Sequence, residues 1–247
     1  LVVGAGVVGL SIALELRGRL PEARIVVLEK ERRAGEHASG RNSGVIHAGF
    51  YYSGDSLKAR LCAEGNRRLT AWCDEHDVPI RKCGKLGVAR NDAELAGFDA
   101  LIEGGQPPAE LAGLDELLRR GRANGVPLET VDAQAAAEIE PRARIHERAL
   151  WSPSTSAVDA GAVMAELERQ ARARRIDVLT DTAWRAARGD AGAETDTGPI
   201  DAGMLVNAAG LYADRVAHAY GCGERYAIVP FKGRYLYGTG LPLAVHI

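Results

Sequence analysis

Three glycines near the start of the chain, Gly4, Gly6 and Gly9, form the pattern G-x-G-x-x-G. The apolar residues Leu1–Val3 precede this pattern and indicate a β-strand, and an apolar-periodic helix follows to about Arg19. In such a turn the first glycine permits the tight bend, the second lets a pyrophosphate approach the backbone, and the third lets the helix pack on the strand. The pattern therefore predicts a dinucleotide site at the edge of a parallel sheet.

The next strand supports the same prediction. Arg24–Leu28 (RIVVL) is typical of a buried parallel strand, and Glu29 follows it, 20 residues after Gly9. A carboxylate at this position accepts hydrogen bonds from a ribose hydroxyl and repels a 2′-phosphate. The alternative is a glycine turn that binds nothing, beside a glutamate that merely lies on the surface.

Composition excludes several classes of protein. The 247 residues suffice for two domains, and 46% hydrophobic content argues against disorder. A net charge of −2 gives no electrostatic signature of nucleic-acid binding. The longest apolar runs, such as Met204–Ala209, are far shorter than the roughly 18 residues of a membrane span. The four cysteines form no C-x-x-C pair, so we expect no metal site and reduced thiols in a cytoplasmic protein.

Hydrophobic periodicity predicts the other elements in outline. A long amphipathic helix is expected over about Ser56–His76, and three further helices over Ala93–Leu101, Ala109–Gly121 and Asp132–Glu140. Residues 31–55 show no sustained periodicity, which is typical of a functional loop. We interpret Arg188–Pro199 as a hairpin turn or loop. The stretch Tyr226–Tyr237 has β character and, because it contains a proline, would be an edge strand.

The segment Gly40–Tyr52 (GRNSGVIHAGFYY) resembles the corresponding segment of L-2-hydroxyglutarate oxidases and dehydrogenases, which belong to the FAD-dependent D-amino-acid oxidase superfamily. Four other segments are similar to later motifs of this family: Ser56–Cys62, Cys83–Leu86, Asn207–Asp214 and Ile228–Tyr235. The resemblance extends over essentially the whole chain. Chains of the family continue well past the position of Ile247, so the resemblance implies a C-terminally truncated fragment.

The resemblance implies an α/β fold, in which a Rossmann-like FAD-binding domain of the glutathione-reductase type is interleaved with an α+β substrate domain. We expect the FAD-binding domain to be discontinuous, with residues 1–78 and 149–221. The substrate-side domain would comprise residues 79–148 and 222–247 and would be incomplete at its C-terminus.

FAD would be held without a covalent bond, because none of the four cysteines lies where a covalent flavin link is expected. The residues expected to contact it share small size, hydrogen-bonding capacity or a place in the motifs above. They are Gly4, Gly6, Val7, Gly9, Glu29, Lys30, Ser39, Arg41, Asn42, Ser43, Gly44, Trp184, Ala209 and Gly210.

The implied reaction is oxidation of L-2-hydroxyglutarate to 2-oxoglutarate, with hydride transfer from the substrate carbon to flavin N5. The substrate hydroxyl must also lose a proton, and His47 is the candidate base because imidazole titrates near neutrality. The alternative is that His47 binds backbone and only shapes the pocket. Candidate substrate contacts are Lys232, Arg234, Arg60 and Tyr51. Solvated surface positions for the cations, and core packing for the tyrosine, are the alternatives.

A small 2-hydroxy dicarboxylate is thus the expected substrate, with oxygen or a membrane quinone as the electron acceptor. A quinone would bring peripheral contact with the inner face of the membrane. One alternative is another oxidase of the superfamily, acting on an amino acid, sarcosine or glycerol 3-phosphate. The other is a non-catalytic nucleotide-binding remnant, inactive because its C-terminal part is missing.

Overall fold

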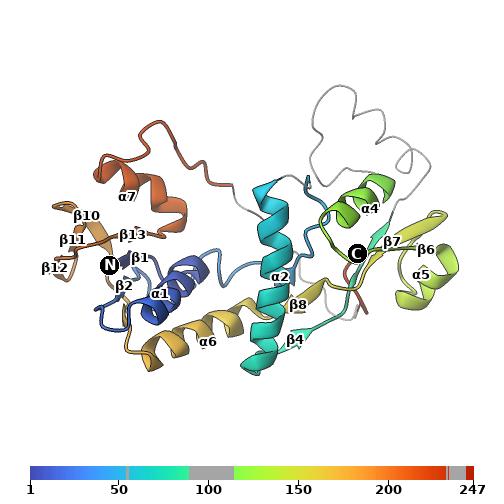
Figure 1. The fold of residues 1–247 in the computed structure, drawn as a ribbon, viewed down its shortest axis with the longest axis horizontal. Helices are drawn as coiled ribbons and strands as arrows, with labels where there is room; N and C mark the ends of the chain where they lie inside the picture. The colour runs from blue at the N-terminus through green and yellow to red at the C-terminus, as the bar shows by residue number, and fades with distance from the viewer. Residues whose placement is uncertain (54–55, 89–113, 232, 234–242) are drawn as a thin grey trace. The chain divides into compact units, whose positions relative to one another are not determined.

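The computed structural model describes residues 1–53, 56–88, 114–231, 233 and 243–247 (Figure 1). The chain forms two compact units: unit 1 contains Leu1–Ser43 and Asp159–Tyr235, and unit 2 contains Gly44–Val158 and Leu236–Ile247. These breaks differ from the expected domain boundaries after residues 78, 148 and 221, and the domain assignment remains a prediction.

The centre of unit 1 is a four-stranded sheet in the order β13-β1-β2-β9 in which every pairing is parallel. Its strands are β1 (Val2–Val3), β2 (Val26–Leu28), β9 (Asp177–Leu179) and β13 (Val206–Asn207). Parallel neighbours need crossover connections, and helices provide the first two of them here. This sheet confirms the predicted α/β fold.

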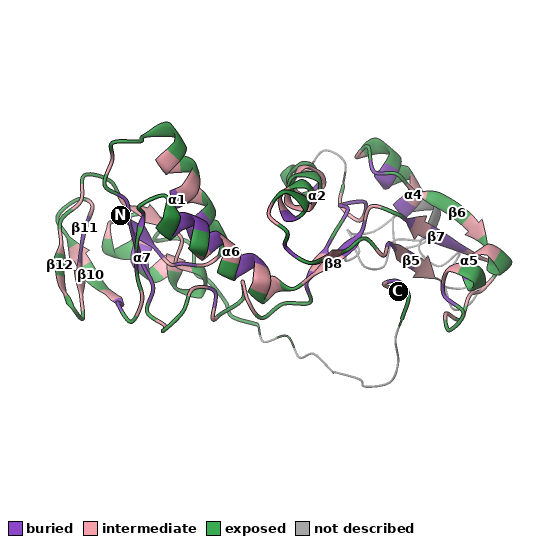
Figure 2. Ribbon diagram, turned by 90° about the horizontal axis from the view of Figure 1, so that it is seen from below, coloured by how far each residue is buried: buried purple, intermediate pink, exposed green. Residues whose placement is uncertain are grey.

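Two helices of unit 1, α1 (Val7–Arg19) and α6 (Ala160–Ala173), lie side by side (Figure 1). Their buried residues follow the period of a helix and gather on one side of each helix (Figure 2). The side chain of Asp159 begins α6, because its Oδ1 accepts from the N–H groups of Gly161 at 2.7 Å and Ala162 at 3.2 Å. The helices α1 and α6 also contact the strands β2 and β9.

A second, antiparallel sheet completes unit 1, with β10 (Trp184–Arg188), β11 (Gly192–Thr195) and β12 (Gly198–Ile200) in that order. It packs with α7 (Ala213–Ala219) on the parallel sheet through a cluster that includes Val3, Leu28, Ala193 and Val216. The prediction of a turn or loop over Arg188–Pro199 was therefore wrong, because strand pairing takes up most of this segment.

Unit 2 contains two three-stranded antiparallel sheets, β3-β8-β4 and β5-β7-β6. Their strands are β3 (Val45–Ile46), β4 (Ile80–Arg81), β5 (Lys85–Val88), β6 (Glu129–Asp132), β7 (Arg148–Ser152) and β8 (Ser156–Val158). The described helices of this unit are α2 (Leu57–Glu75), α4 (Leu114–Ala123) and α5 (Ala133–Ile139). The long helix predicted over Ser56–His76 is thus confirmed.

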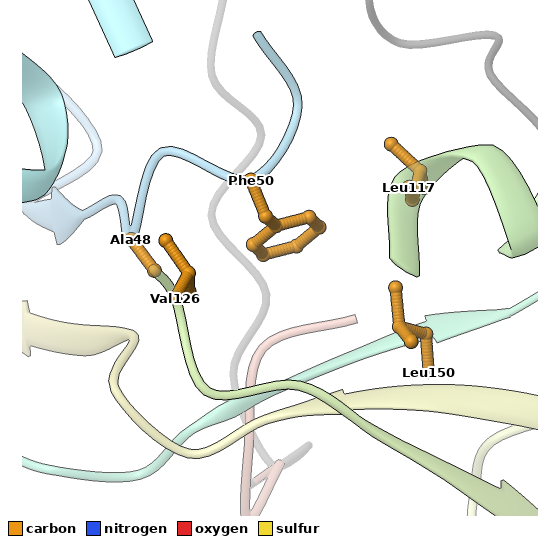
Figure 3. Close-up of a cluster of buried hydrophobic side chains, with 5 residues drawn as sticks. All are labelled: Ala48, Phe50, Leu117, Val126 and Leu150. Carbon is orange, nitrogen blue, oxygen red and sulfur yellow. The ribbon is translucent and has the colours of Figure 1, made fainter. Parts of the chain in front are cut away.

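Figure 3 shows a core cluster of unit 2, in which Phe50 lies between helix α4 and the strands. Phe50 is 1% exposed and packs with Ala48, Leu117, Val126 and Leu150. Full burial of a side chain of this size stabilises a fold by roughly 1.5–3 kcal/mol. The cluster therefore fixes the segment that leads from β3 to the aromatic pair Tyr51 and Tyr52.

Two further expectations differ from the structure. Residues 31–55 are not without structure, because Val45–Ile46 pairs with β8 as strand β3. Residues 226–231 form no strand and are exposed, so the predicted edge strand is wrong over these residues. The predicted helix Ala93–Leu101 lies outside the described residues. Among the helices that the structure describes, none has both the length and the apolar character needed to span a membrane.

Candidate functional site

The glycine turn after β1 has the geometry that only glycine allows. Gly4 has φ +104°, and a Cβ there would lie 2.4 Å from the carbonyl oxygen of Ala208. A Cβ on Gly9 would lie 1.9 Å from the carbonyl oxygen of Gly4. At Gly6 a Cβ would be 3.0 Å from Ser39 Oγ. Gly4 and Gly9 thus allow the turn itself, whereas Gly6 keeps its surroundings open.

The N-terminus of α1 opens at this turn. The first helical hydrogen bond runs from Leu10 N to Gly6 O at 3.0 Å, so the N–H groups of Val8 and Gly9 have no intrahelical acceptor. The N–H of Val7 donates to Ser39 Oγ at 3.0 Å. The helix dipole adds partial positive charge at this end, and the whole turn therefore favours an anion such as a pyrophosphate.

The carboxylate of Glu29 is buried, 8% exposed, and held by the backbone on both oxygens. Its Oε2 accepts from Ala5 N and its Oε1 accepts from Glu31 N, both at 3.0 Å. Each oxygen retains a further lone pair that can accept from a hydroxyl. The orientation of the carboxylate is thus fixed before any ribose binds.

A cavity of about 620 Å³ in unit 1 brings these features together. Its size falls within the range of small-molecule and cofactor sites. Eight of the residues predicted to bind the cofactor line it: Gly4, Gly6, Glu29, Lys30, Ser39, Trp184, Ala209 and Gly210. An adenosine pyrophosphate requires small residues that leave it space, a helix N-terminus that donates to its phosphates and a fixed carboxylate that accepts from its ribose. The residues present therefore fit the nucleotide half of FAD.

The other six predicted cofactor residues do not line this cavity, and their role stays a prediction. Val7 and Gly9 shape the turn, as described above. Asn42 donates from Nδ2 to the carbonyl oxygens of Ala38 at 3.0 Å and Ser39 at 2.9 Å, and thereby fixes the loop that carries Ser39. Ser43 is exposed.

Arg41 and Gly44 are also absent from the lining of this cavity. Arg41 lines a second, smaller hollow of unit 1 of about 260 Å³. Gly44 belongs to unit 2, has φ +69° and accepts from Val158 N at 2.8 Å. A Cβ on Gly44 would lie 2.1 Å from the carbonyl oxygen of Val158, so both the close packing and the positive φ require glycine there.

Sequence reasoning singled out Lys30 at the cavity but missed the charged and aromatic residues around it. Lys30 and His37 hydrogen-bond to the carboxylate of Glu31, with Lys30 as the stronger influence, and together they lower the pKa of that carboxylate to about 2. The ring of Tyr212 has the Lys30 ammonium and the Arg215 guanidinium each 5.3 Å from its centroid. Tyr212 and Arg215 line the cavity as well. Tyr212 lies within the segment Asn207–Asp214 that resembles the family, and Arg215 follows it directly, but neither was predicted to contact the cofactor.

The predicted base His47 lies in unit 2 and is exposed. Partial burial of its ring lowers its pKa below 6.5, and the positive charges of Lys85, His246 and Lys58 lower it further. The ring lies edge-on to Tyr51, with centroids 6.2 Å apart. His47 is therefore neutral at neutral pH, which is the protonation state that a base requires.

The predicted substrate contacts have different environments. Tyr51 stacks on Phe50 with ring centroids 4.1 Å apart, and burial raises the pKa of its hydroxyl. Arg60 is exposed on α2. Lys232 and Arg234 lie outside the described residues. Of the two that the structure describes, Tyr51 meets the ring of His47, and all four roles stay predictions.

Comparison with known proteins agrees with this geometry. The DAO family, described as FAD dependent oxidoreductase, matches residues 1–245. The mitochondrial L-2-hydroxyglutarate dehydrogenase of Nematostella vectensis is 37% identical over 253 residues, which is 95% of this chain and 52% of that protein. The L-2-hydroxyglutarate dehydrogenase of Escherichia coli K12 is 32% identical over 238 residues, with the same shares covered. The chain spans about half the length of these curated relatives.

Solved structures show the same fold. Glycine oxidase from Geobacillus kaustophilus has a TM-score of 0.72 and 24% identity, over 89% of this chain and 57% of that chain. L-alpha-glycerophosphate oxidase from Mycoplasma pneumoniae with FAD bound has a TM-score of 0.70 and 22% identity, over 89% of this chain and 56% of that chain. The glycine turn, the fixed Glu29, the cavity beside them and the family match lead to one assignment: this chain belongs to the DAO family of FAD-dependent oxidoreductases.

Proposed function

We propose that the protein containing this chain oxidises L-2-hydroxyglutarate to 2-oxoglutarate with FAD as its cofactor. The observation that carries this proposal is the 32–37% identity, over 95% of the chain, to proteins named L-2-hydroxyglutarate dehydrogenase. The solved structures do not bear on the substrate, because at 24% identity or less they support the fold alone.

The reaction removes two electrons and two protons from the substrate. Bound FAD supplies the two-electron acceptor that takes the hydride from C2. A ring nitrogen of His47 accepts the proton of the C2 hydroxyl, so that the C–O single bond becomes a carbonyl as the C–H bond breaks. The lowered pKa of His47 supports this role, because a larger fraction of the imidazole is free to take a proton at neutral pH.

The chain also has to bind two carboxylates and hold the cofactor. Glu29, Gly6, Ser39 and the start of α1 would hold the nucleotide half of FAD. Lys232, Arg234 and Arg60 supply cations for the substrate, and Tyr51 supplies one wall of its pocket. Oxygen or a quinone would serve as the electron acceptor, and a quinone would bring peripheral contact with a membrane surface.

Anaerobic titration of the full-length, FAD-loaded protein tests the proposal. L-2-Hydroxyglutarate should bleach the flavin absorbance, while D-2-hydroxyglutarate, glycine, sarcosine and glycerol 3-phosphate should leave it unchanged. Bleaching by one of these other compounds and not by the L-hydroxy acid would assign a different substrate. A protein that carries FAD and responds to none of the five compounds would refute the proposed function.

A matched variant tests the role of the base. His47→Gln keeps the size and polarity of the side chain but cannot accept the proton, so flavin reduction should slow by about 10²–10⁴-fold. The FAD content should stay at the wild-type level, because His47 does not line the cavity of unit 1. An unchanged rate of reduction would leave His47 only the alternative role of shaping the pocket.

A further inference from the structure

Two lysines of unit 2 lie over adjacent aromatic rings near His47. The ammonium of Lys58 is 4.3 Å from the centroid of Tyr52, and that of Lys85 is 4.9 Å from the centroid of Tyr51. Tyr51 is also the ring that His47 meets edge-on, at 6.2 Å. The two rings are consecutive in the chain, so both ammonium groups are held on one short segment, next to the candidate base.

The elements that carry these groups are independently fixed. Lys58 lies in the first turn of α2, where Ser56 Oγ accepts from Ala59 N at 3.1 Å. Lys85 begins β5 and follows Gly84, whose φ of +71° and contact with Trp151 admit no other residue without a clash. A Cβ on Gly84 would lie 1.9 Å from the Trp151 ring. Both cations therefore project from rigid structure.

Within the part of the chain that the structure describes, the charges that act on His47 have one sign. The described groups whose charge lowers its pKa are Lys85, His246 and Lys58, in that order after burial, and the two lysines are the cations among them at neutral pH. Lys85 and His246 are paired across a β-bridge, which places their side chains next to each other. Arg81 adds positive charge at His246. Such a group of cations attracts and concentrates anions.

We propose that Lys58 and Lys85, held over Tyr52 and Tyr51, form an anion subsite that binds a carboxylate of the substrate beside His47. That the bound anion is a substrate carboxylate rests on the proposed function. The subsite adds two lysines of this unit, Lys58 and Lys85, to the substrate cations proposed above. It favours an anionic substrate because each lysine contributes a full positive charge near the candidate base.

Glutarate is a suitable probe, because it carries both carboxylates but lacks the hydroxyl and cannot be oxidised at C2. Its dissociation constant would be measured by titration calorimetry on the full-length, FAD-loaded protein. Lys85→Gln and Lys58→Gln should each raise the Kd for glutarate by about tenfold or more, because each removes a charge-assisted hydrogen bond. Lys85→Arg, which keeps the charge, should bind glutarate within a few-fold of wild type.

Lys82→Gln is the matched control. Lys82 lies three residues before Lys85, is exposed, and pairs with Asp74 at 2.7 Å. The Lys82→Gln variant should bind glutarate with the wild-type Kd. FAD content and melting temperature of every variant report whether it has folded. If Lys85→Gln does not fold, Lys58→Gln carries the test, because its side chain is exposed on the surface of α2.

A second measurement tests directly whether the charge of Lys85 acts on His47. Removing the positive charge of Lys85 should raise the pKa of His47 towards its ordinary value of 6.5, which NMR titration of the imidazole would detect.

A wild-type Kd for glutarate in both Lys→Gln variants would overturn the subsite, even if L-2-hydroxyglutarate reduces the flavin. If that substrate fails but glutarate binds in a lysine-dependent manner, the proposed function is wrong and the subsite stands.

Discussion

At the residue scale, two glycines of helix α1 should respond in opposite ways to substitution by alanine. A Cβ on Gly9 would lie 1.9 Å from the carbonyl oxygen of Gly4, whereas a Cβ on Gly18 meets nothing within 4 Å. Gly9→Ala should therefore lower the free energy of unfolding and the FAD content. Gly18→Ala should raise the free energy of unfolding by roughly 0.5–1 kcal/mol, because alanine favours the helix.

Urea denaturation and the ratio of flavin to protein absorbance would measure both effects. The two variants add the same methyl group to the same helix, so a general effect of the substitution is controlled. Equal stabilities of the two variants would show that the close packing of the turn is not required.

The titration of His47 also belongs to the residue scale. Its pKa is lowered by partial burial and by Lys85, His246 and Lys58, so the neutral ring persists below pH 6.5. The value of kcat/KM should be constant around neutrality and fall as the pH drops through this lowered pKa. A pH profile on the full-length enzyme would check this. If kcat/KM already falls by half at or above pH 6.5, the group that titrates is not His47.

At the scale of elements, the buried carboxylate of Glu140 joins helix α5 to the segment 243–247. Glu140 is 1% exposed, and it accepts from Ala244 N at 2.6 Å and from Arg142 N at 3.1 Å. These backbone bonds, with Ala244 first, lower its pKa below 4.5. The stabilisation is therefore present above the unfolded-state value of about 4.5 and is lost as the pH falls through the lower folded-state pKa.

Glu140→Gln should loosen this segment, because the amide group would turn a donor towards one of two backbone N–H groups. Hydrogen exchange should become faster at Leu86, whose N–H donates to His246 O at 2.8 Å. Glu138→Gln, exposed two residues earlier, is the control and should leave exchange unchanged. Equal protection of Leu86 in both variants would show that the carboxylate is dispensable.

Short strands show where element prediction fails. Strands β3 and β8 have two and three residues, and neither has enough alternation to identify it. They exist because they pair with each other, with Val45 opposite Ala157. By contrast, α5 begins where the sequence predicted, since Asp132 caps it through a local hydrogen bond, and Asp159 caps α6 in the same way.

At the scale of the whole molecule, the nucleotide site is built by two distant stretches of the chain. Residues 3–39 and 182–216 both line the cavity of unit 1. Addition of FAD to the apoprotein should therefore slow hydrogen exchange in the glycine turn and around Ala209 together. Helix α5 of unit 2 serves as the internal reference. Protection confined to the first stretch would contradict a site shared by both.

The sequence by itself determined the glycine turn, the acidic residue after β2 and the start of helix α5, because these depend on backbone conformation and hydrogen bonds within a few residues. It also carried the family resemblance. Only the tertiary structure decided which predicted residues line the cavity, that Gly44 serves packing, and that Lys85 and His246 lie near His47. Those outcomes depend on pairing between residues far apart in the chain, and local periodicity contains no information about such pairing.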